Sequence, residues 1–150
     1  MTTFKAILFL FFLSLSINLT ARNDGTTMAP ILEKTKSLIS YIEDEVNQEV
    51  VHAEMDILAD TKTVFRSLQK GYTYQIIAYG DFRFKDIDVT VYRWNGDKWV
   101  MTVKDTENKD MAIVSIKPVT SSDYKIEVKA YKFNKGFDVG HYGLIICHEK

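Results

Sequence analysis

The chain has 150 residues, a net charge of −1, and 46% hydrophobic and 26% charged residues. This composition is typical of one globular domain and excludes a largely disordered chain. Nucleic-acid-binding domains usually carry a basic surplus, so the near-neutral charge argues against nucleic acid as a partner.

Residues 1–21 predict a secretory signal peptide. Lys5 supplies the positive start, and residues 6–19 form an apolar run of 14 residues. A membrane-spanning helix needs about 20 residues, so this run fits a signal better than a span. We place the cleavage near Ala21, although Leu19 is a poor match at its position, and an uncleaved anchor is the alternative. The expected location is secreted or periplasmic, with no membrane contact after cleavage.

The sequence predicts no cofactor, metal site or disulfide. Cys147 is the single cysteine, and it lies in the apolar run LIIC, which favours a buried thiol. On a strand, its neighbour His148 would point to the opposite face, away from the thiol. His52 and His141 have no metal-ligand spacing with another histidine or with the cysteine.

Residues 28–60 predict a long amphipathic helix, with a possible break at Asn47-Gln48. Pro30 suits a first helical turn, and Thr27 is a candidate cap. Residues 31–60 contain eight acids and two lysines, a net charge of −6. We expect the apolar stripe to pack on the chain's own β-domain or on a second copy. The stripe consists of Leu32, Ile39, Ile42, Val46, Val50, Ala53 and Ile57.

From Thr61 onward the apolar period changes to two, with a turn signal at Lys70-Gly71. At least six strands with turns between them predict an antiparallel sandwich. The predicted fold class is therefore α+β: a signal segment, one long and possibly broken amphipathic helix in 22–60, and a jelly-roll-like β-sandwich in 61–150. Residues 61–150 carry 15 basic and 11 acidic residues, a charge of +4 that favours contact with the acidic helix.

The stretch KDIDVTVYRWNGDKW, residues 85–99, predicts a β-hairpin. Asn-Gly is a strong signal for a two-residue type I′ turn. Such a turn would pair Trp94 with Asp97 and Tyr92 with Trp99. Alternation along the first strand sends one apolar set into the core, and it consists of Ile87, Val89 and Val91. The other face then carries an aromatic cluster.

The order of signals in residues 61–147 resembles the bacterial pre-peptidase C-terminal domain family. No single motif is specific, but the order and spacing match across nearly the whole β-half. The matching segments are Gly71-Tyr72, DIDVTVY at 86–92, VSIKP at 114–118, YKIEV at 124–128 and GHYGLII at 140–146. The sequence departs from the family at Ser122-Asp123, where a glycine is usual, and the helical segment lies outside the match. The resemblance implies a secreted, non-catalytic sandwich that accompanies enzymes, and related collagen-binding modules use calcium and surface aromatics.

Asp86 and Asp88 lie two residues apart, so a strand places both carboxylates on one side. We expect them to cap turns by accepting backbone N–H groups. Two alternatives stay open: a calcium site that also includes Asp81, and a small secreted hydrolase that uses Asp86 and Asp88.

The aromatic face, Tyr92, Trp94 and Trp99, is the candidate partner surface. It could bind a protein or a glycan, or it could be covered by the chain's own helix. The sequence therefore predicts an exported accessory or binding module without catalytic residues, with a protein or glycan as partner and an oligomer possible through the helix.

Overall fold

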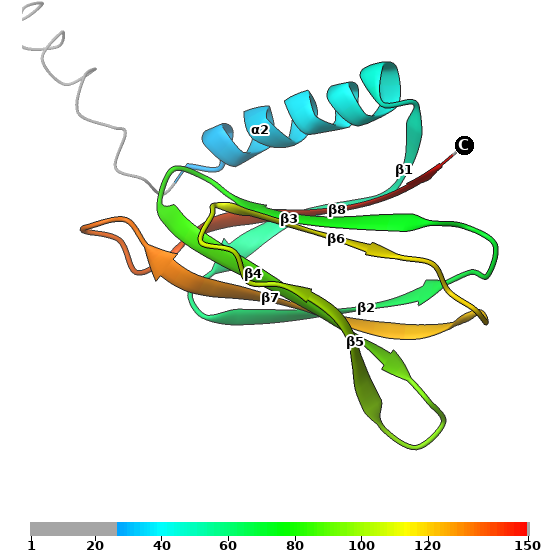
Figure 1. Ribbon diagram of the computed structural model, residues 1–150. Helices are drawn as coiled ribbons and strands as arrows, with labels where there is room; N and C mark the ends of the chain where they lie inside the picture. Colours follow the sequence, from blue (N-terminus) through cyan, green and yellow to red (C-terminus); the bar gives the residue numbers. More distant parts are fainter. Residues whose placement is uncertain (1–26, 150) are drawn as a thin grey trace, which may run out of the picture.

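The computed structural model describes residues 27–149, so the predicted signal segment lies outside the described residues. One helical segment precedes eight strands (Figure 1). Helix α2 (Ala29–Ser40) continues into a π-helical turn, η1 (Tyr41–Glu45). The strands are β1 (Gln48–Leu58), β2 (Thr61–Leu68), β3 (Tyr74–Gly80), β4 (Phe84–Trp94), β5 (Trp99–Asp105), β6 (Met111–Ile116), β7 (Ser122–Phe133) and β8 (Gly140–Glu149).

The strands form two antiparallel four-stranded sheets. Sheet A has the order β1-β8-β3-β6, and sheet B has the order β2-β7-β4-β5. Two such sheets packed face to face, with strands alternating between them in this order, make a jelly roll. The predicted α+β class with a jelly-roll-like sandwich is confirmed.

The main core lies between the sheets, and alternation along each strand fills it. Ile87, Val89 and Val91 are fully buried there, as the hairpin stretch predicted. From sheet A, Ile76, Leu144 and Ile146 face them across the gap. Gly143 is required on the other face of sheet A, because a Cβ at this position would lie 2.3 Å from the Tyr79 ring.

A second core lies between sheet A and helix α2, which covers the outer face of that sheet (Figure 1). Ile31 and Ile42 are the buried helical residues, and they pack with Ile145 and Cys147 of β8. Thr35 accepts a hydrogen bond from the Tyr79 hydroxyl at 2.8 Å, so a polar contact in this interface is also satisfied. The prediction that the helix packs on its own sandwich is confirmed, but of the first four stripe residues only Ile39 and Ile42 face the sheet. Leu32 and Val46 are 54% and 41% exposed, and Ile31 lies inward in place of Leu32.

The predicted helix is too long, because residues 48–58 form strand β1. The helical segment ends at Glu45, and Asn47 has a positive φ of 57°, which turns the chain toward β8 at the predicted break. β1 then pairs with β8 from Gln48 to Leu58. The predicted stripe positions Val50, Ala53 and Ile57 therefore lie on a strand, in a segment whose polar and apolar residues alternate with a period of two.

The β4–β5 hairpin has a longer loop than predicted. Trp94 pairs with Trp99, and Tyr92 pairs with Met101, so four residues connect the strands. The Asn95 side chain accepts hydrogen bonds from the backbone N–H groups of Asp97 and Lys98, at 3.0 and 2.8 Å. These bonds stabilise the wider loop, and the predicted pairing of Trp94 with Asp97 is wrong.

Candidate functional site

Exposed and half-buried aromatic side chains form a strip on the outer face of sheet B. Trp94 and Trp99 lie opposite each other at the end of the hairpin, with ring centroids 5.2 Å apart. The Trp99 ring also lies 5.6 Å from the Phe65 ring of β2. Three strands therefore contribute to one surface, which we call the aromatic strip: Phe65, Tyr92, Trp94 and Trp99. Sequence analysis missed Phe65, since only the sheet order brings β2 to the same face as the hairpin.

Tyr92 anchors the polar side of the aromatic strip. The Lys125 ammonium lies 4.1 Å from the Tyr92 ring centroid, a cation–π geometry, and it also pairs with Glu127 at 2.8 Å. Burial and the neighbouring Glu127 carboxylate raise the pKa of the Tyr92 phenol. Burial acts to raise the pKa of Glu127, but hydrogen bonds from Lys125 and Tyr92 outweigh it and lower that pKa. Glu127 therefore stays ionised beside the strip.

A hollow of about 270 Å³ lies between the Phe65 and Trp99 side chains, and Arg66, Ser67 and Asp123 complete its lining. The Ser67 hydroxyl donates a hydrogen bond to the Asp123 carboxylate at 2.5 Å. The hollow thus combines two aromatic walls with a carboxylate and a hydroxyl, whereas the Arg66 guanidinium is held at the β1–β2 edge by Glu54. Such a combination of flat apolar surface and a few placed polar groups suits a small ring-shaped ligand group.

Helix α2 does not cover the aromatic strip, because it packs on sheet A and the strip lies on sheet B. The expectation that the helix could bury Tyr92, Trp94 and Trp99 is therefore wrong. Phe65 is 55% exposed and Trp94 is 38% exposed. The strip is thus open to solvent in the described part of the chain.

The three predicted acids, Asp81, Asp86 and Asp88, each lie in a different environment. Asp81 is buried and pairs with Arg83 at 2.9 Å, and it also accepts the backbone N–H of Arg83 at 3.0 Å. Buried Asp86 accepts the backbone N–H of Lys109 at 3.2 Å, a contact across 23 residues rather than a local turn. Burial and then the Asp86 charge raise the pKa of Asp88. Within residues 27–149, no group of three potential metal ligands gathers at one place.

Cys147, His148 and His141 pack against other residues of the fold. Cys147 lies under helix α2, and burial raises the pKa of its thiol to about 11. His148 points to the other face of β8 and stacks on Tyr72, with ring centroids 4.5 Å apart. His141 contacts Arg83 through Nδ1 at 3.1 Å. The predicted separation of Cys147 and His148 is confirmed.

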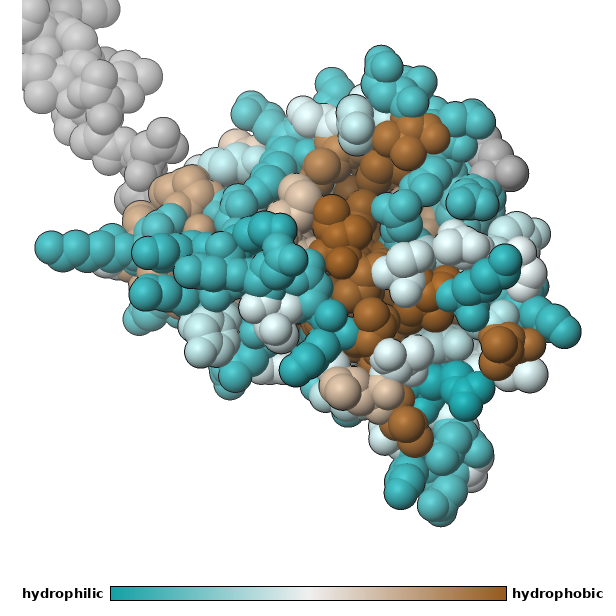
Figure 2. All heavy atoms as spheres, viewed as in Figure 1, coloured by the Kyte–Doolittle hydropathy of each residue, from teal (hydrophilic) through white to brown (hydrophobic). Residues whose placement is uncertain are grey.

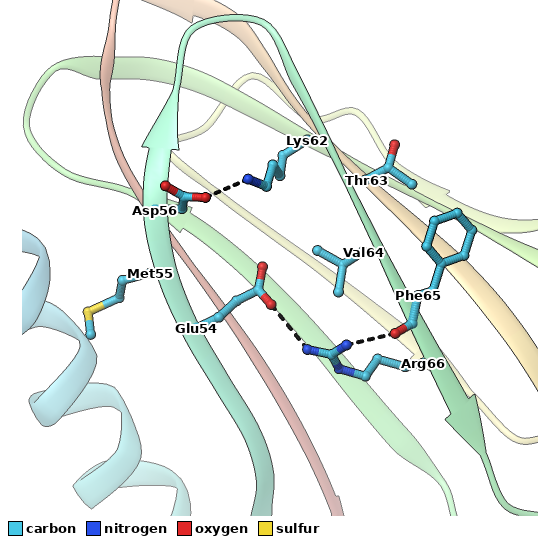
Figure 3. A pocket seen from close by; sticks show the side chains of 8 residues that line it. All are labelled: Glu54, Met55, Asp56, Lys62, Thr63, Val64, Phe65 and Arg66. Atoms are coloured by element: carbon cyan, nitrogen blue, oxygen red, sulfur yellow. Dashed lines mark hydrogen bonds and ion pairs between the residues drawn. The ribbon is translucent and has the colours of Figure 1, made fainter.

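Charged side chains close the edge of the sandwich where β1 and β2 meet (Figure 3). Glu54 pairs with Arg66 at 3.2 Å, and Asp56 pairs with Lys62 at 2.5 Å. These residues line a hollow of about 480 Å³. Glu54 also accepts the hydroxyl of buried Tyr142 at 2.9 Å. Inward-pointing charges of this kind protect edge strands from pairing with other chains, so we assign the cluster to the fold.

An apolar band crosses the opposite edge of the sandwich. In Figure 2 it runs from helix α2 past β6 toward the β4–β5 hairpin. A groove of about 520 Å³ lies in this region, and its lining includes Val100, Val103, Ile116 and Val119. Arg93 and Lys117 also line this groove.

No helix among the described residues is long and apolar enough to cross a membrane.

Comparison with known proteins shows the fold. No protein-family model matches the sequence, and no curated protein matches it. Among solved structures, the pre-peptidase C-terminal domain of a collagenase from Bacillus anthracis is similar, with a TM-score of 0.50 and 11% identity over 63% of this chain and 87% of that chain. The mitogen of Yersinia pseudotuberculosis has a TM-score of 0.49 and 11% identity over 69% of this chain and 87% of its own. The predicted resemblance to the pre-peptidase C-terminal domain is confirmed at the level of the fold.

Proposed function

We propose that the protein is an exported, non-catalytic binding module that holds a polysaccharide on the aromatic strip. The observation that carries the proposal is the Phe65–Trp99–Trp94 row, with centroid spacings of 5.6 and 5.2 Å, on a sheet face that the helix leaves open. The export and accessory role follow from the predicted signal segment and from the family resemblance.

The chemistry around the row favours a glycan over a protein. Sugar rings present apolar C–H faces, which stack on aromatic rings, and hydroxyl edges, which need hydrogen-bond partners. The hollow beside Trp99 supplies such partners in Asp123 and Ser67. A protein hot spot would instead call for a larger apolar surface around the aromatic anchors, and the neighbours of Tyr92 on this face are the charged Lys125 and Glu127.

The proposal is tested with affinity electrophoresis against a panel of neutral and acidic polysaccharides, using the wild-type protein and Trp99→Ala. We expect at least one polysaccharide to retard the wild type and Trp99→Ala to lose most of that retardation. Tyr131→Ala is the matched control, because Tyr131 is also an exposed aromatic residue of sheet B but lies outside the strip. Retardation by no polysaccharide, or equal retardation of Trp99→Ala and the wild type, contradicts glycan binding at this surface.

A further inference from the structure

Four exposed apolar side chains gather at one end of the sandwich, far from the aromatic strip. Phe82 lies in the β3–β4 turn, and Phe137 and Val139 lie in the β7–β8 loop. Met28 immediately precedes helix α2 and is also exposed. Both connections and the start of α2 lie at the same end in Figure 1. We call this set, Met28, Phe82, Phe137 and Val139, the tip.

The tip is held rigidly. The Phe82 and Phe137 rings meet edge to face, with centroids 5.7 Å apart. Asn134 joins their two loops: its amide nitrogen donates to the carbonyls of Phe82 at 2.7 Å and Phe84 at 3.2 Å, and its backbone N–H donates to the carbonyl of Arg83 at 2.8 Å. Phe82 nevertheless stays 54% exposed. Exposed aromatic rings on a preorganised backbone are characteristic of a contact surface rather than of a loosely packed loop.

A buried polar cluster supports the tip from behind. Asp81 pairs with Arg83 at 2.9 Å and accepts the backbone N–H of His141 at 3.1 Å. The Arg83 guanidinium also donates to the carbonyl of Thr27 at 3.2 Å. This bond holds Thr27, the first residue that the structure describes, against the buried Arg83 side chain. The tip and the entry point of the N-terminal segment are therefore one structural unit.

The sequence before Thr27 indicates what the tip faces. The apolar run ends at Leu19, eight residues before Thr27. Eight residues span at most about 29 Å even when fully extended. When the apolar run lies in a bilayer, Thr27 is therefore no more than about 29 Å from the end of that run. The tip is then the end of the domain that reaches the membrane surface.

Charge at the tip fits an anionic surface. Lys85, Lys132 and Lys135 are exposed in residues 81–85 and 132–139, whereas Asp138 is the exposed acid of these two segments. Lysines beside exposed aromatic rings favour the interface of anionic phospholipid, where the rings enter the headgroup layer. The neighbouring β5–β6 loop adds Asp110, which is paired with Lys34 at 2.8 Å, and Glu107, which is paired with Lys109. The β1–β2 turn at this end adds the exposed Asp60.

We propose that the tip docks on the surface of an anionic phospholipid bilayer, with Phe82 and Phe137 as the inserting residues. The 14-residue apolar run is short for a span, and stable membrane attachment generally takes two weak signals together. The tip supplies the second signal for as long as residues 1–21 are attached.

The test uses the full chain with Val139→Cys labelled by an environment-sensitive fluorophore. Buried Cys147, whose pKa is raised to about 11, does not compete for the label. Vesicles of phosphatidylglycerol and phosphatidylethanolamine carry a doxyl-lipid quencher. We expect a blue shift and strong quenching at position 139. Val119→Cys, at the opposite end and 70% exposed, should show neither.

A second pair of variants isolates the two phenylalanines. Phe82→Ser with Phe137→Ser should remove most of the quenching at position 139, whereas Phe65→Ser, an exposed aromatic of the other surface, should leave it unchanged. Equal quenching at positions 139 and 119 overturns membrane docking and leaves the tip as a protein contact. Quenching that survives the double substitution equally overturns the role of Phe82 and Phe137.

Discussion

Helix α2 can be released from sheet A by one substitution, and Cys147 reports the release. Ile31 is fully buried in the second core, together with Tyr79, Ile145 and Cys147. Ile31→Ala removes side-chain carbons from this interface. Such truncations cost about 2–5 kcal/mol at buried sites. Because the helix lies at the surface and can settle into part of the space, we expect the lower part of that range, about 2–3 kcal/mol.

The assay measures how often the helix leaves the sheet. A thiol reagent reaches Cys147 only when the helix opens, so the labelling rate follows the population of the open state. A cost of about 2–3 kcal/mol corresponds to a labelling rate roughly 30–150 times faster, at about 1.4 kcal/mol per tenfold. Labelling is followed without denaturant, and urea unfolding of the same variants gives the global free energy of unfolding.

The neighbouring residue provides the control. Leu32 is 54% exposed, so Leu32→Ala should change the free energy of unfolding by no more than about 0.5 kcal/mol and leave the labelling rate nearly unchanged. The tryptophan emission of both folded variants should stay at its wild-type wavelength, because Trp94 and Trp99 lie on the other sheet. If Ile31→Ala labels no faster than Leu32→Ala, the packing of Ile31 on sheet A is not what protects Cys147 from the reagent.

Two further predictions concern the acids. Burial and the Asp86 charge raise the pKa of Asp88, so the folded protein holds this proton more tightly than the unfolded chain does. The stability that this group contributes therefore falls as the pH rises above about 4. Asp88→Asn should flatten the fall in unfolding free energy between pH 4 and pH 6 in urea titrations, and an unchanged slope would contradict the raised pKa. Asp81→Asn leaves the buried Arg83 charge without its carboxylate and should cost about 3–5 kcal/mol of unfolding free energy. The control, Asp110→Asn at an exposed pair, should cost at most about 1 kcal/mol in the same assay. Equal losses would show that the buried pair stabilises the fold no more than a surface pair does.

The core could be predicted from sequence wherever a strand buries one face only. Val89 and Val91 alternate with polar residues in the sequence, and the structure buries them as expected. The edge strand β1 also alternates, but the sequence analysis predicts it as part of a helix. Its inward positions are charged, and Glu54 and Asp56 become stable there only through partners on β2. Those partners are in the opposite sheet, and the sequence contains no local sign of the pairing.

The hairpin shows a different limit. Asn-Gly predicts a turn, but the loop length depends on which hydrogen bonds the Asn95 side chain makes. Here it accepts from two backbone N–H groups, which stabilises four connecting residues in place of two. The shift puts Trp99 opposite Trp94, rather than opposite Tyr92. A local sequence signal therefore predicted the turn, while the side-chain bond determined the register and with it the geometry of the aromatic strip.

The helix determines which broad face of the sandwich is open for binding. Each sheet buries one face in the main core, so each has one outer face to cover or to use. Sheet A offers the apolar Ile77 and Ile145 on its outer face, and the buried side of α2 covers them. Sheet B carries Lys125 and Glu127 among its aromatics, and this face needs no cover to remain in water. The charges of −6 in residues 31–60 and +4 in residues 61–150 favour contact between the two segments, but we expect apolar burial to decide where the helix packs. Apolar burial, at about 25 cal/mol per Å², outweighs surface ion pairs that contribute about 0–1 kcal/mol each. The helix therefore packs where the sheet is most apolar, and the aromatic strip stays open because charged residues surround it.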